Sequence, residues 1–222
     1  MTEFVYVKPR SATGLLALGD TERVAESLRR GSPAVLPTET GYMLAALATS
    51  EDAVKRAFEV KDRPTSAVMH VACASLRMAA AVGVLTERAT ALLGRFTPGP
   101  LSVIVSQTGL LPDGLVTVNG TVGIRVPDHP ATLQVITAVG APLTATSLNS
   151  SGSRLPSVDE PALRTLNWPG DDPVYVVRDD ASIAYDSAST LVRLTGESIE
   201  ILRPGPVSES EINTATGGTH AT

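Results

Sequence analysis

The sequence predicts a mixed α/β domain in which helices cover a central sheet. Short apolar runs of the kind that form strands alternate along the chain with longer segments whose apolar residues recur at helical spacing. The last two strand-like runs flank Gly196 and indicate an antiparallel hairpin, which argues against a purely parallel, doubly wound sheet. With 222 residues, the chain is long enough for one sizeable core.

Local signals predict the elements in order. Strands are expected at residues 4–7, 34–36, 67–72, 101–106, 122–126, 143–145, 174–177, 190–194 and 198–202. Helices are expected at residues 21–30, after Ser50, at 75–82, 87–96 and 130–139, and after Asp159. Asp20, Ser50 and Asp159 are the expected N-caps of three of these helices. Pro130 suits the first turn of another.

We expect one domain over residues 1–206 and a flexible tail over 207–222, because that ending is small and polar. No apolar run is long enough to span a membrane, and the N-terminus lacks a basic-then-apolar leader, so a cytoplasmic protein is expected. Cys73 is the single cysteine and is expected to be a buried, small apolar residue.

The charge balance and the absence of common fingerprints exclude several function classes. The net charge of −5 argues against a large nucleic-acid footprint, so direct, stable tRNA binding is not expected. Neither a GxGxxG turn nor a GxxxxGK[ST] loop is present. The three histidines are scattered without carboxylate spacing, so we predict no protein metal site.

The most informative stretch is Leu-Pro-Thr-Glu-Thr-Gly-Tyr at residues 36–42, which follows a short apolar run and indicates a strand that opens into a turn. In an extended backbone, residues two apart face the same side. Thr38 and Thr40 can therefore offer paired hydroxyls to one small polar ligand. The alternative is that the two hydroxyls only cap the local backbone.

Two basic positions suggest phosphate chemistry. Lys61 and Arg63 are two residues apart, and Pro64 favours extended geometry at Arg63, so their side chains are expected to be parallel and to suit a polyphosphate. The alternative is a solvated surface pair. Arg125 lies among apolar neighbours and needs an anion, which is either Asp128, a helix-end carbonyl or a ligand.

Further polar residues gather at the ends of expected strands. Ser147, Asn149 and Ser151 alternate after an apolar strand and can form a cradle for phosphate or ribose, or simply a polar loop with Asx-type turns. His70 lies in an apolar strand, either as a core histidine or as a site residue. The Asp-His-Pro stretch at 128–130 is expected to begin a helix and not to form a catalytic dyad.

Five segments in one register point to a known family. They are Pro-Thr-Glu-Thr-Gly-Tyr at 37–42, Lys-Asp-Arg-Pro at 61–64, Pro-Gly-Pro-Leu at 98–101, Arg-Val-Pro-Asp-His-Pro at 125–130 and Thr-Ser-Leu-Asn-Ser-Ser-Gly at 146–152, followed by Ser-Thr-Leu-Val at 189–192. Their order and spacing resemble the YrdC-like family, whose best-known members are threonylcarbamoyl-AMP synthases. The resemblance covers about residues 35–203.

The resemblance implies a twisted mixed sheet with flanking helices and a concave, basic cavity. It implies a short, single-domain nucleotidyltransferase that makes threonylcarbamoyl-AMP from L-threonine, bicarbonate or CO₂, and ATP, and releases pyrophosphate. The product would serve threonylcarbamoyladenosine modification of tRNA through a separate transferase protein, and Mg²⁺ would arrive with ATP.

The resemblance also assigns residue roles. Lys61 and Arg63 are expected to be catalytic through their grip on the ATP phosphates. Nucleotide binding is expected of Lys61, Arg63, Arg125, Ser147, Asn149, Ser151, Thr190 and Arg203. Substrate binding is expected of Thr38, Thr40, Tyr42, His70 and Ser189.

Several positions depart from the family pattern. Met43-Leu44-Ala45 replaces a usual Gly-Leu-Gly, Leu148 replaces an alanine, Arg193 replaces a frequent aspartate, and the loop after Pro64 is short. Leu148 could crowd the base pocket or turn outward. Two alternatives therefore remain: a paralogue that forms a carbamoyl-adenylate with a different amine in a specialised pathway, and a non-catalytic nucleotide- or RNA-binding module.

Overall fold

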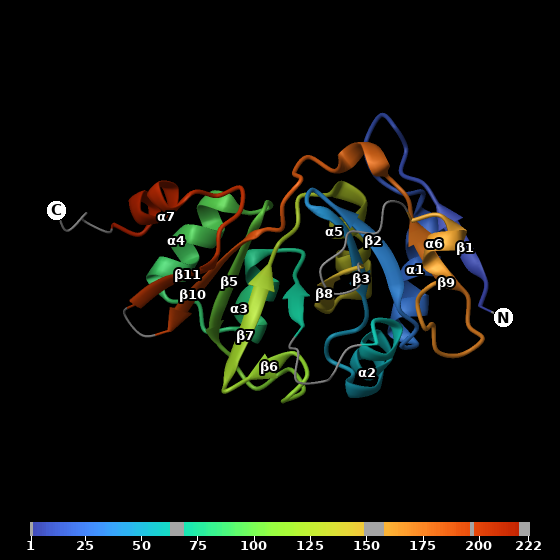
Figure 1. The fold of residues 1–222 in the computed structure, drawn as a ribbon, viewed down its shortest axis with the longest axis horizontal. Coiled ribbons are helices and arrows are strands. Elements are labelled where there is room, and N and C mark those ends of the chain that lie inside the picture. Colours follow the sequence, from blue (N-terminus) through green and yellow to red (C-terminus); the bar gives the residue numbers. More distant parts are fainter. Residues whose placement is uncertain (1, 63–68, 149–157, 196–197, 218–222) are drawn as a thin grey trace.

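The computed structural model describes residues 2–62, 69–148, 158–195 and 198–217, whose elements are shown in Figure 1. In chain order these are β1 (Phe4–Val7), α1 (Leu18–Arg29), β2 (Ala34–Thr38), β3 (Gly41–Ala45), α2 (Glu51–Val60), β4 (His70–Ala72), α3 (Leu76–Val82), α4 (Glu87–Phe96), β5 (Leu101–Ser106), β6 (Thr117–Val118), β7 (Thr121–Arg125), α5 (Pro130–Val139), β8 (Leu143–Ser147), α6 (Glu160–Leu163), β9 (Val174–Val177), the 3₁₀ turn η1 (Asp180–Ser182), β10 (Thr190–Thr195), β11 (Ser198–Arg203) and α7 (Glu209–Ala215).

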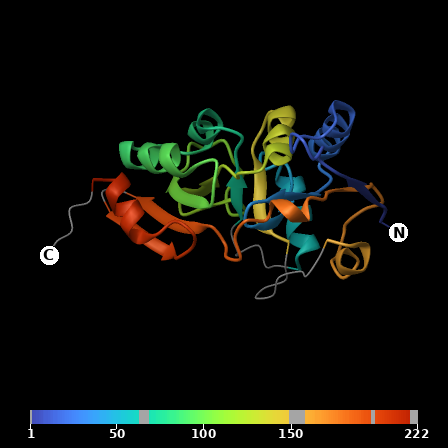
Figure 2. The same ribbon diagram turned by 90° about the horizontal axis from the view of Figure 1, so that it is seen from above.

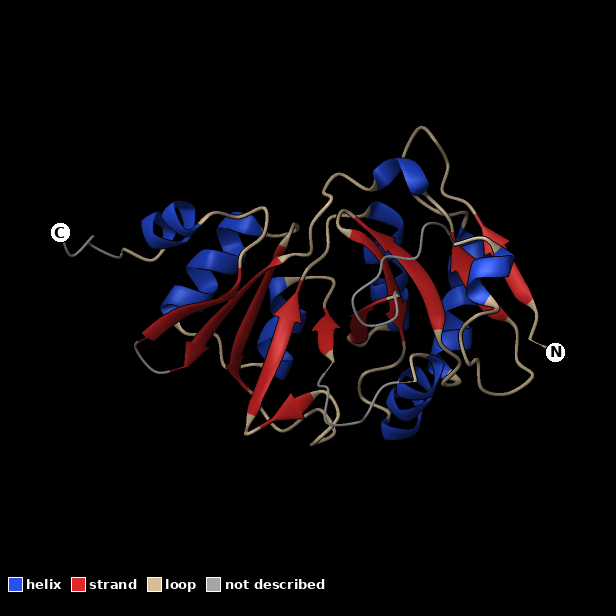
Figure 3. Cartoon of the chain, in the orientation of Figure 1, coloured by secondary structure: helices blue, strands red, loops and turns tan. Residues whose placement is uncertain are grey.

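One mixed sheet runs through the molecule, as predicted. Its strand order is β1-β9-β2-β3-β8-β4-β7-β5-β10-β11, and β6 pairs with β7. The sheet contains both parallel pairs, such as β4–β7, and antiparallel pairs, such as β4–β8 and the predicted β10–β11 hairpin. Figure 3 shows the strands passing between the helices, and β1 and α7 lie at opposite ends of the long axis.

Helices cover both faces of the sheet. Figure 2 shows α1, α5, α3 and α4 along one side, with α2 and α6 on the other. On the first side, Leu28 of α1 and Ile136 of α5 are fully buried against Leu36 of β2. A second core gathers Phe58 of α2 and Leu92 of α4 with residues of β5, β7 and β10. No helix in the described part of the chain is long and apolar enough to cross a membrane.

Most helix starts follow the expected chemistry. Ser50 accepts a hydrogen bond from Ala53 N at 3.3 Å, and Asp159 accepts one from Ala162 N at 3.0 Å. Pro130 occupies the first turn of α5 as expected. The prediction for α1 was wrong by three residues: the helix begins at Leu18, so Asp20 lies inside its first turn, where a negative charge suits the positive end of the helix dipole.

Strand β3 was not predicted. It pairs antiparallel with β2, and the connection is a tight turn at Glu39 and Thr40. Gly41 has φ +117°, a conformation that glycine adopts without strain, and this allows the chain to reverse directly after Thr40. The pattern Thr-Glu-Thr-Gly-Tyr carries no clear strand alternation at the turn, which is why the sequence alone did not indicate the hairpin.

The expectation of a flexible tail over residues 207–222 was wrong for its first part. Residues 209–215 form α7, whose Ser208 and Glu211 make reciprocal capping hydrogen bonds. Ile212 is fully buried, and Val207 is also buried. The polar composition of the segment hid the fact that one isoleucine on the inner face of a short helix is enough to dock it beside α4.

Candidate functional site

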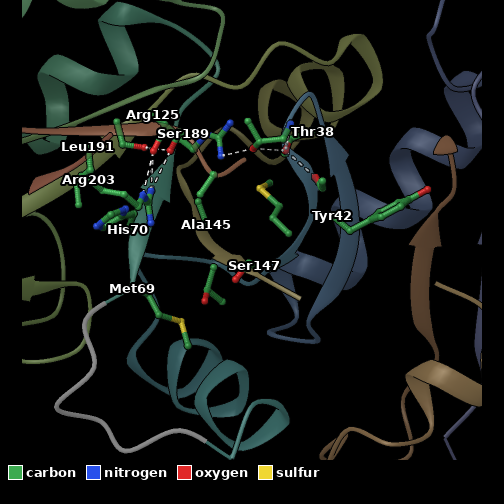
Figure 4. A pocket seen from close by; sticks show the side chains of 16 residues that line it. Thr38, Tyr42, Met69, His70, Arg125, Ala145, Ser147, Ser189, Leu191 and Arg203 are labelled. Carbon is green, nitrogen blue, oxygen red and sulfur yellow. Dashed lines mark hydrogen bonds between the residues drawn. The ribbon is translucent and has the colours of Figure 1, made fainter. Parts of the chain in front are cut away.

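A cavity of about 300 Å³ opens where the middle strands of the sheet end. Figure 4 shows the side chains that line it. They are contributed by β2, β3, β4, β5, β7, β8, β10 and β11 and their connections: Thr38, Thr40, Gly41, Tyr42, Met43, Met69, His70, Ser102, Arg125, Ala145, Thr146, Ser147, Ala188, Ser189, Leu191 and Arg203. Eight of the thirteen residues predicted for the site are among them, and neither the segment at 61–64 nor the one at 98–101 contributes to this lining.

Thr38 and Thr40 do converge on the cavity, but not for the predicted reason. Thr38 ends β2 and Thr40 lies in the tight turn that follows, so the two residues do not share one continuous extended strand. Their hydroxyl oxygens are 3.2 Å apart, and the Thr38 hydroxyl donates to the Gly41 carbonyl at 2.6 Å. Local capping and exposure to the cavity therefore occur together. The donated proton leaves the Thr38 oxygen as an acceptor.

Arg125 finds its anion in Glu39, a residue that the sequence analysis did not single out. Arg125 Nη2 lies 2.6 Å from Glu39 Oε1, and the two side chains are 11% and 4% exposed. Arg125 Nη1 also donates to Thr40 Oγ1 at 3.2 Å, and the second Glu39 oxygen accepts from Asp128 N at 2.9 Å. A carboxylate placed directly after a buried apolar strand was the available signal, because a charge there needs a partner.

On the opposite wall, Arg203 and two serines form a second polar group. Arg203 Nε and Nη2 donate to the Ser189 carbonyl at 3.0 and 2.9 Å, and the hydroxyls of Ser189 and Ser102 are 2.8 Å apart. Burial lowers the pKa of the Arg203 guanidinium from its usual range, and the nearby charge of Arg125 lowers this pKa further. This wall therefore carries a positive charge held in a partly desolvated place.

Lys61 is buried, which rules out the solvated surface pair at this position. It is 9% exposed, and its ammonium group donates to the Ser147 carbonyl and to Thr146 Oγ1, the latter at 3.4 Å. The expectation of extended geometry was wrong here, because Lys61 ends α2 with helical backbone angles. Arg63, Asn149 and Ser151 lie outside the described residues, so their roles stay predictions.

His70 lies on the cavity wall and not in the sealed core. Its ring packs on Gly123, where an added Cβ would meet the ring at 2.4 Å. The neighbouring strand therefore needs glycine at this position for the ring to stay in place.

Two predicted site hydroxyls are directed elsewhere. The Tyr42 hydroxyl donates to Asp180 Oδ1 at 2.7 Å and accepts from Asp179 N at 3.0 Å, and Figure 4 shows the ring pointing away from the other labelled residues. Burial and Asp180 raise the pKa of Tyr42. Thr190 is buried and bonds both the N–H and the carbonyl of Val207, so the expectation that it faces the cavity was wrong.

The departures from the family pattern separate in the structure. Met43 lines the cavity, whereas Leu148 is buried in the core and does not crowd the cavity. Arg193 forms an exposed ion pair with Glu200 on the edge hairpin, at 2.8 Å. Only Met43 of these three can contact a ligand in the cavity.

The remaining titratable candidates have structural roles. His129 caps α5 by accepting from Thr132 N, which confirms the predicted helix start. Cys73 is buried, and burial raises the pKa of its thiol to about 12. Among the described residues no group of histidine, cysteine and carboxylate ligands could hold a metal ion.

This mixed α/β domain therefore has one cavity into which arginines and hydroxyls from several strands converge, a lining whose chemistry suits a small anionic ligand. The family model Sua5/YciO/YrdC, described as telomere recombination, matches residues 26–205. The chain therefore belongs to this family, and the resemblance read from the five motifs is confirmed.

The chain is also similar to individual members of the family. It is 33% identical to a threonylcarbamoyl-AMP synthase of Bacillus subtilis over 89% of this chain and 57% of that one. The structure of Pyrococcus abyssi Sua5 complexed with L-threonine matches at TM-score 0.83 and 28% identity, over 98% of this chain and 62% of that one. This chain thus spans less than two thirds of either protein.

A third similar structure covers nearly the whole of both chains. It is that of Escherichia coli YciO, with a TM-score of 0.75 over 93% of this chain and 97% of that one. At 23% identity, this likeness shows the fold alone.

Proposed function

We propose that this protein is a nucleotidyltransferase that makes threonylcarbamoyl-AMP from L-threonine, bicarbonate or CO₂, and ATP. The observation that carries the proposal is the cavity itself: two guanidinium groups and paired hydroxyls face one space of about 300 Å³. Support comes from the likeness to a Sua5 structure complexed with L-threonine. The reaction needs polar groups and cations in fixed positions and no protein nucleophile, which is the kind of lining that this cavity has.

The chemistry divides into two steps. The threonine amine attacks the carbon of CO₂ and loses a proton, which gives an N-carboxylate. One oxygen of that carboxylate then bonds to the α-phosphorus of ATP, and the bond to the bridging oxygen breaks as pyrophosphate leaves. Charge develops on phosphate oxygens, so neutralisation by Arg203 and Lys61 would favour the second step. Mg²⁺ would enter with ATP, held by phosphates and water, since the Glu39 carboxylate is already engaged.

The two ends of the cavity suit different parts of this reaction. Thr38 and Thr40 on one wall and Ser189 on the opposite wall offer hydroxyls at one end, which match the amine, carboxylate and hydroxyl of an amino acid. Lys61 anchors Ser147 at the other end, next to the segment where the family binds phosphate. We propose that the amino acid lies at the threonine hairpin and the triphosphate nearer Lys61. The product would pass to a separate transferase that modifies tRNA.

The test is direct. The protein is incubated with ATP, Mg²⁺, ¹³C-bicarbonate and one amino acid at a time, and pyrophosphate and the acyl-adenylate mass are measured. The proposal expects pyrophosphate and a ¹³C-containing threonylcarbamoyl-AMP only when threonine is present. Pyrophosphate release without that mass would contradict it. Binding of ATP by calorimetry, with no turnover for any amine, would favour the non-catalytic module.

One observation favours the second candidate, a carbamoyl-adenylate synthase with a different amine. Met43 lines the cavity at a position where the family usually has glycine, so its side chain takes up room in the cavity wall. A larger side chain in the wall changes which substrate side chain fits. The same assay with other amines decides between the two candidates, because each predicts a different acyl-adenylate mass.

A further inference from the structure

Glu39, which the sequence alone did not single out, accepts hydrogen bonds from several separate segments around the cavity. Its side-chain oxygens accept from Arg125 Nη2 at 2.6 Å and from Asp128 N at 2.9 Å. Its backbone carbonyl accepts from Ala184 N at 2.9 Å and Tyr185 N at 3.0 Å. These contacts join the β2–β3 turn to the end of β7, to the start of α5 and to the segment that leads to Ser189.

The Glu39–Arg125 pair connects strands that are not neighbours. Between β2 and β7 the sheet contains β3, β8 and β4. Four strand spacings in a flat sheet would separate β2 and β7 by roughly 19 Å, more than these two side chains can reach. The sheet therefore curls at the cavity, and this cross-sheet ion pair closes the curl on one side. Arg125 lines the cavity, so the ion pair ties the β2–β3 turn to β7 at the cavity wall.

The same pair fixes the direction of Arg125. A guanidinium is planar, and two of its nitrogens are held by Glu39 and Thr40. Its Nε is buried and has no hydrogen-bond partner within the described residues. A buried donor without a partner is unfavourable. The guanidinium therefore keeps its position because Glu39 and Thr40 hold two of its nitrogens, even though this leaves Nε without a hydrogen bond in the described residues.

We propose that Glu39 is a positioning residue for the cavity: its carboxylate holds the hairpin against β7 and aims the Arg125 guanidinium at the bound amino acid. This inference rests on the proposed function. Glu39 does not itself reach substrate in this arrangement, because both oxygens are engaged with the protein. Glu39 affects the reaction only through Arg125. A double variant can therefore distinguish this role from that of a residue that acts on the substrate independently.

The test compares Glu39→Gln, Arg125→Gln and the double variant with the parent protein. Glutamine keeps the shape of the side chain and removes the charge. Glu200→Gln is the matched control, because it also removes a carboxylate paired with an arginine, but on the exposed edge hairpin. The measurements are kcat and KM for threonine in pyrophosphate release and, separately, the Kd of L-threonine by calorimetry.

We expect Glu39→Gln to lose at least tenfold in kcat/KM for threonine and to bind threonine more weakly. The double variant should be no worse than Arg125→Gln alone, and Glu200→Gln should stay within twofold of the parent. Glu39→Asp, which keeps the charge, should lose less than Glu39→Gln. Parental kinetics in Glu39→Gln would overturn the proposal, and so would a double variant whose loss is the product of the two single losses.

Other outcomes are also decisive. If Glu39→Gln does not fold, Glu39→Asp takes its place, and unchanged threonine binding in that variant overturns the positioning role. If the parent protein neither binds threonine nor forms product, the proposed function fails, and the thermal midpoints of the four proteins still test the cross-sheet ion pair. Midpoint losses that are less than additive support it, and strictly additive losses overturn it.

Discussion

Two arginines face the same cavity, but only one of them has a carboxylate partner among the described residues. Arg125 extends from β7 and is paired with a buried carboxylate at 2.6 Å. Arg203 extends from β11 and donates to the backbone carbonyl and the hydroxyl of Ser189, with no carboxylate partner among the described residues. A carbonyl accepts hydrogen bonds but carries no net charge, so nothing in the described part of the chain compensates the positive charge of Arg203.

The difference indicates that one residue type has two tasks here. Arg125 with Glu39 is a nearly neutral unit that sets geometry. Arg203 keeps a net charge in a partly buried place, where burial and Arg125 lower its pKa from the usual range. An anionic ligand beside Arg203 would offset the cost of this partly buried charge, because an opposite charge nearby favours the charged form. We therefore expect Arg125 to matter most for stability and Arg203 most for turnover.

Arg125→Gln should give the largest effect, on stability. It leaves the Glu39 carboxylate buried without its charge partner, and breaking a buried pair in this way costs about 3–5 kcal/mol of unfolding free energy. Urea denaturation of parent and variant measures the change. A loss below about 1 kcal/mol would mean that water or another group replaces the guanidinium, and the contrast with Arg203 would disappear.

Arg203→Gln should follow, with the effect on catalysis. Removal of a charged hydrogen-bonding group that meets phosphate or carboxylate costs about 1.5–3 kcal/mol, which is roughly a ten- to 150-fold loss in kcat/KM. The free energy of unfolding should change by less than about 1 kcal/mol, since no buried charge is left unpaired. Steady-state kinetics and urea denaturation of the same preparation check both parts. A large loss of stability in Arg203→Gln with normal kcat/KM would mean that Arg203 serves stability and not turnover.

Thr40→Val sharpens the comparison on the hairpin wall. Valine keeps the shape and removes the hydroxyl that contacts Thr38 and Arg125, each at 3.2 Å. Loss of one such partner weakens amino-acid binding by about 1–3 kcal/mol. Calorimetry with threonine and with ATP, done separately, should show weaker threonine binding and nearly unchanged ATP binding. Loss of ATP affinity alone would mean that the two ligands lie the other way round.

The smallest effect should come from His129, behind the hairpin wall. Burial lowers the pKa of this imidazole, although Asp179, at 3.3 Å from Nε2, opposes the shift. The unfolded chain therefore binds more protons than the folded one just below pH 6.5. The stability that the neutral His129 imidazole gives to the folded state is therefore fully present above pH 6.5. It is lost as the pH falls through the lowered pKa of this residue.

Comparison of the parent with His129→Asn tests this pH dependence. Asparagine can also cap a helix, so α5 should keep its start. Urea denaturation between pH 5 and pH 7 should show a shallower fall of stability in the variant. Equal slopes in the two proteins would assign the acid sensitivity to other groups.

Much of the local structure could be predicted from the sequence. The strands at 101–106 and 174–177 and the helix at 130–139 were placed with their observed bounds, because apolar spacing and caps are properties of neighbouring residues. The motifs were also enough to identify the family. The β2–β3 hairpin and α7 were not predicted. The first depends on one glycine and the second on one buried isoleucine, and a single residue produces no recognisable periodicity in a window of ten residues.

The sequence by itself therefore determined the fold class, the family and a set of polar residues that meet in one cavity. Only the tertiary structure decided which of them face it. Leu148 turns into the core, Thr190 turns to Val207, and Glu39 meets an arginine 86 residues away. The physical reason is that the curl of the sheet, set by packing on both faces, brings distant strand ends together, and no local pattern records where that curl lies.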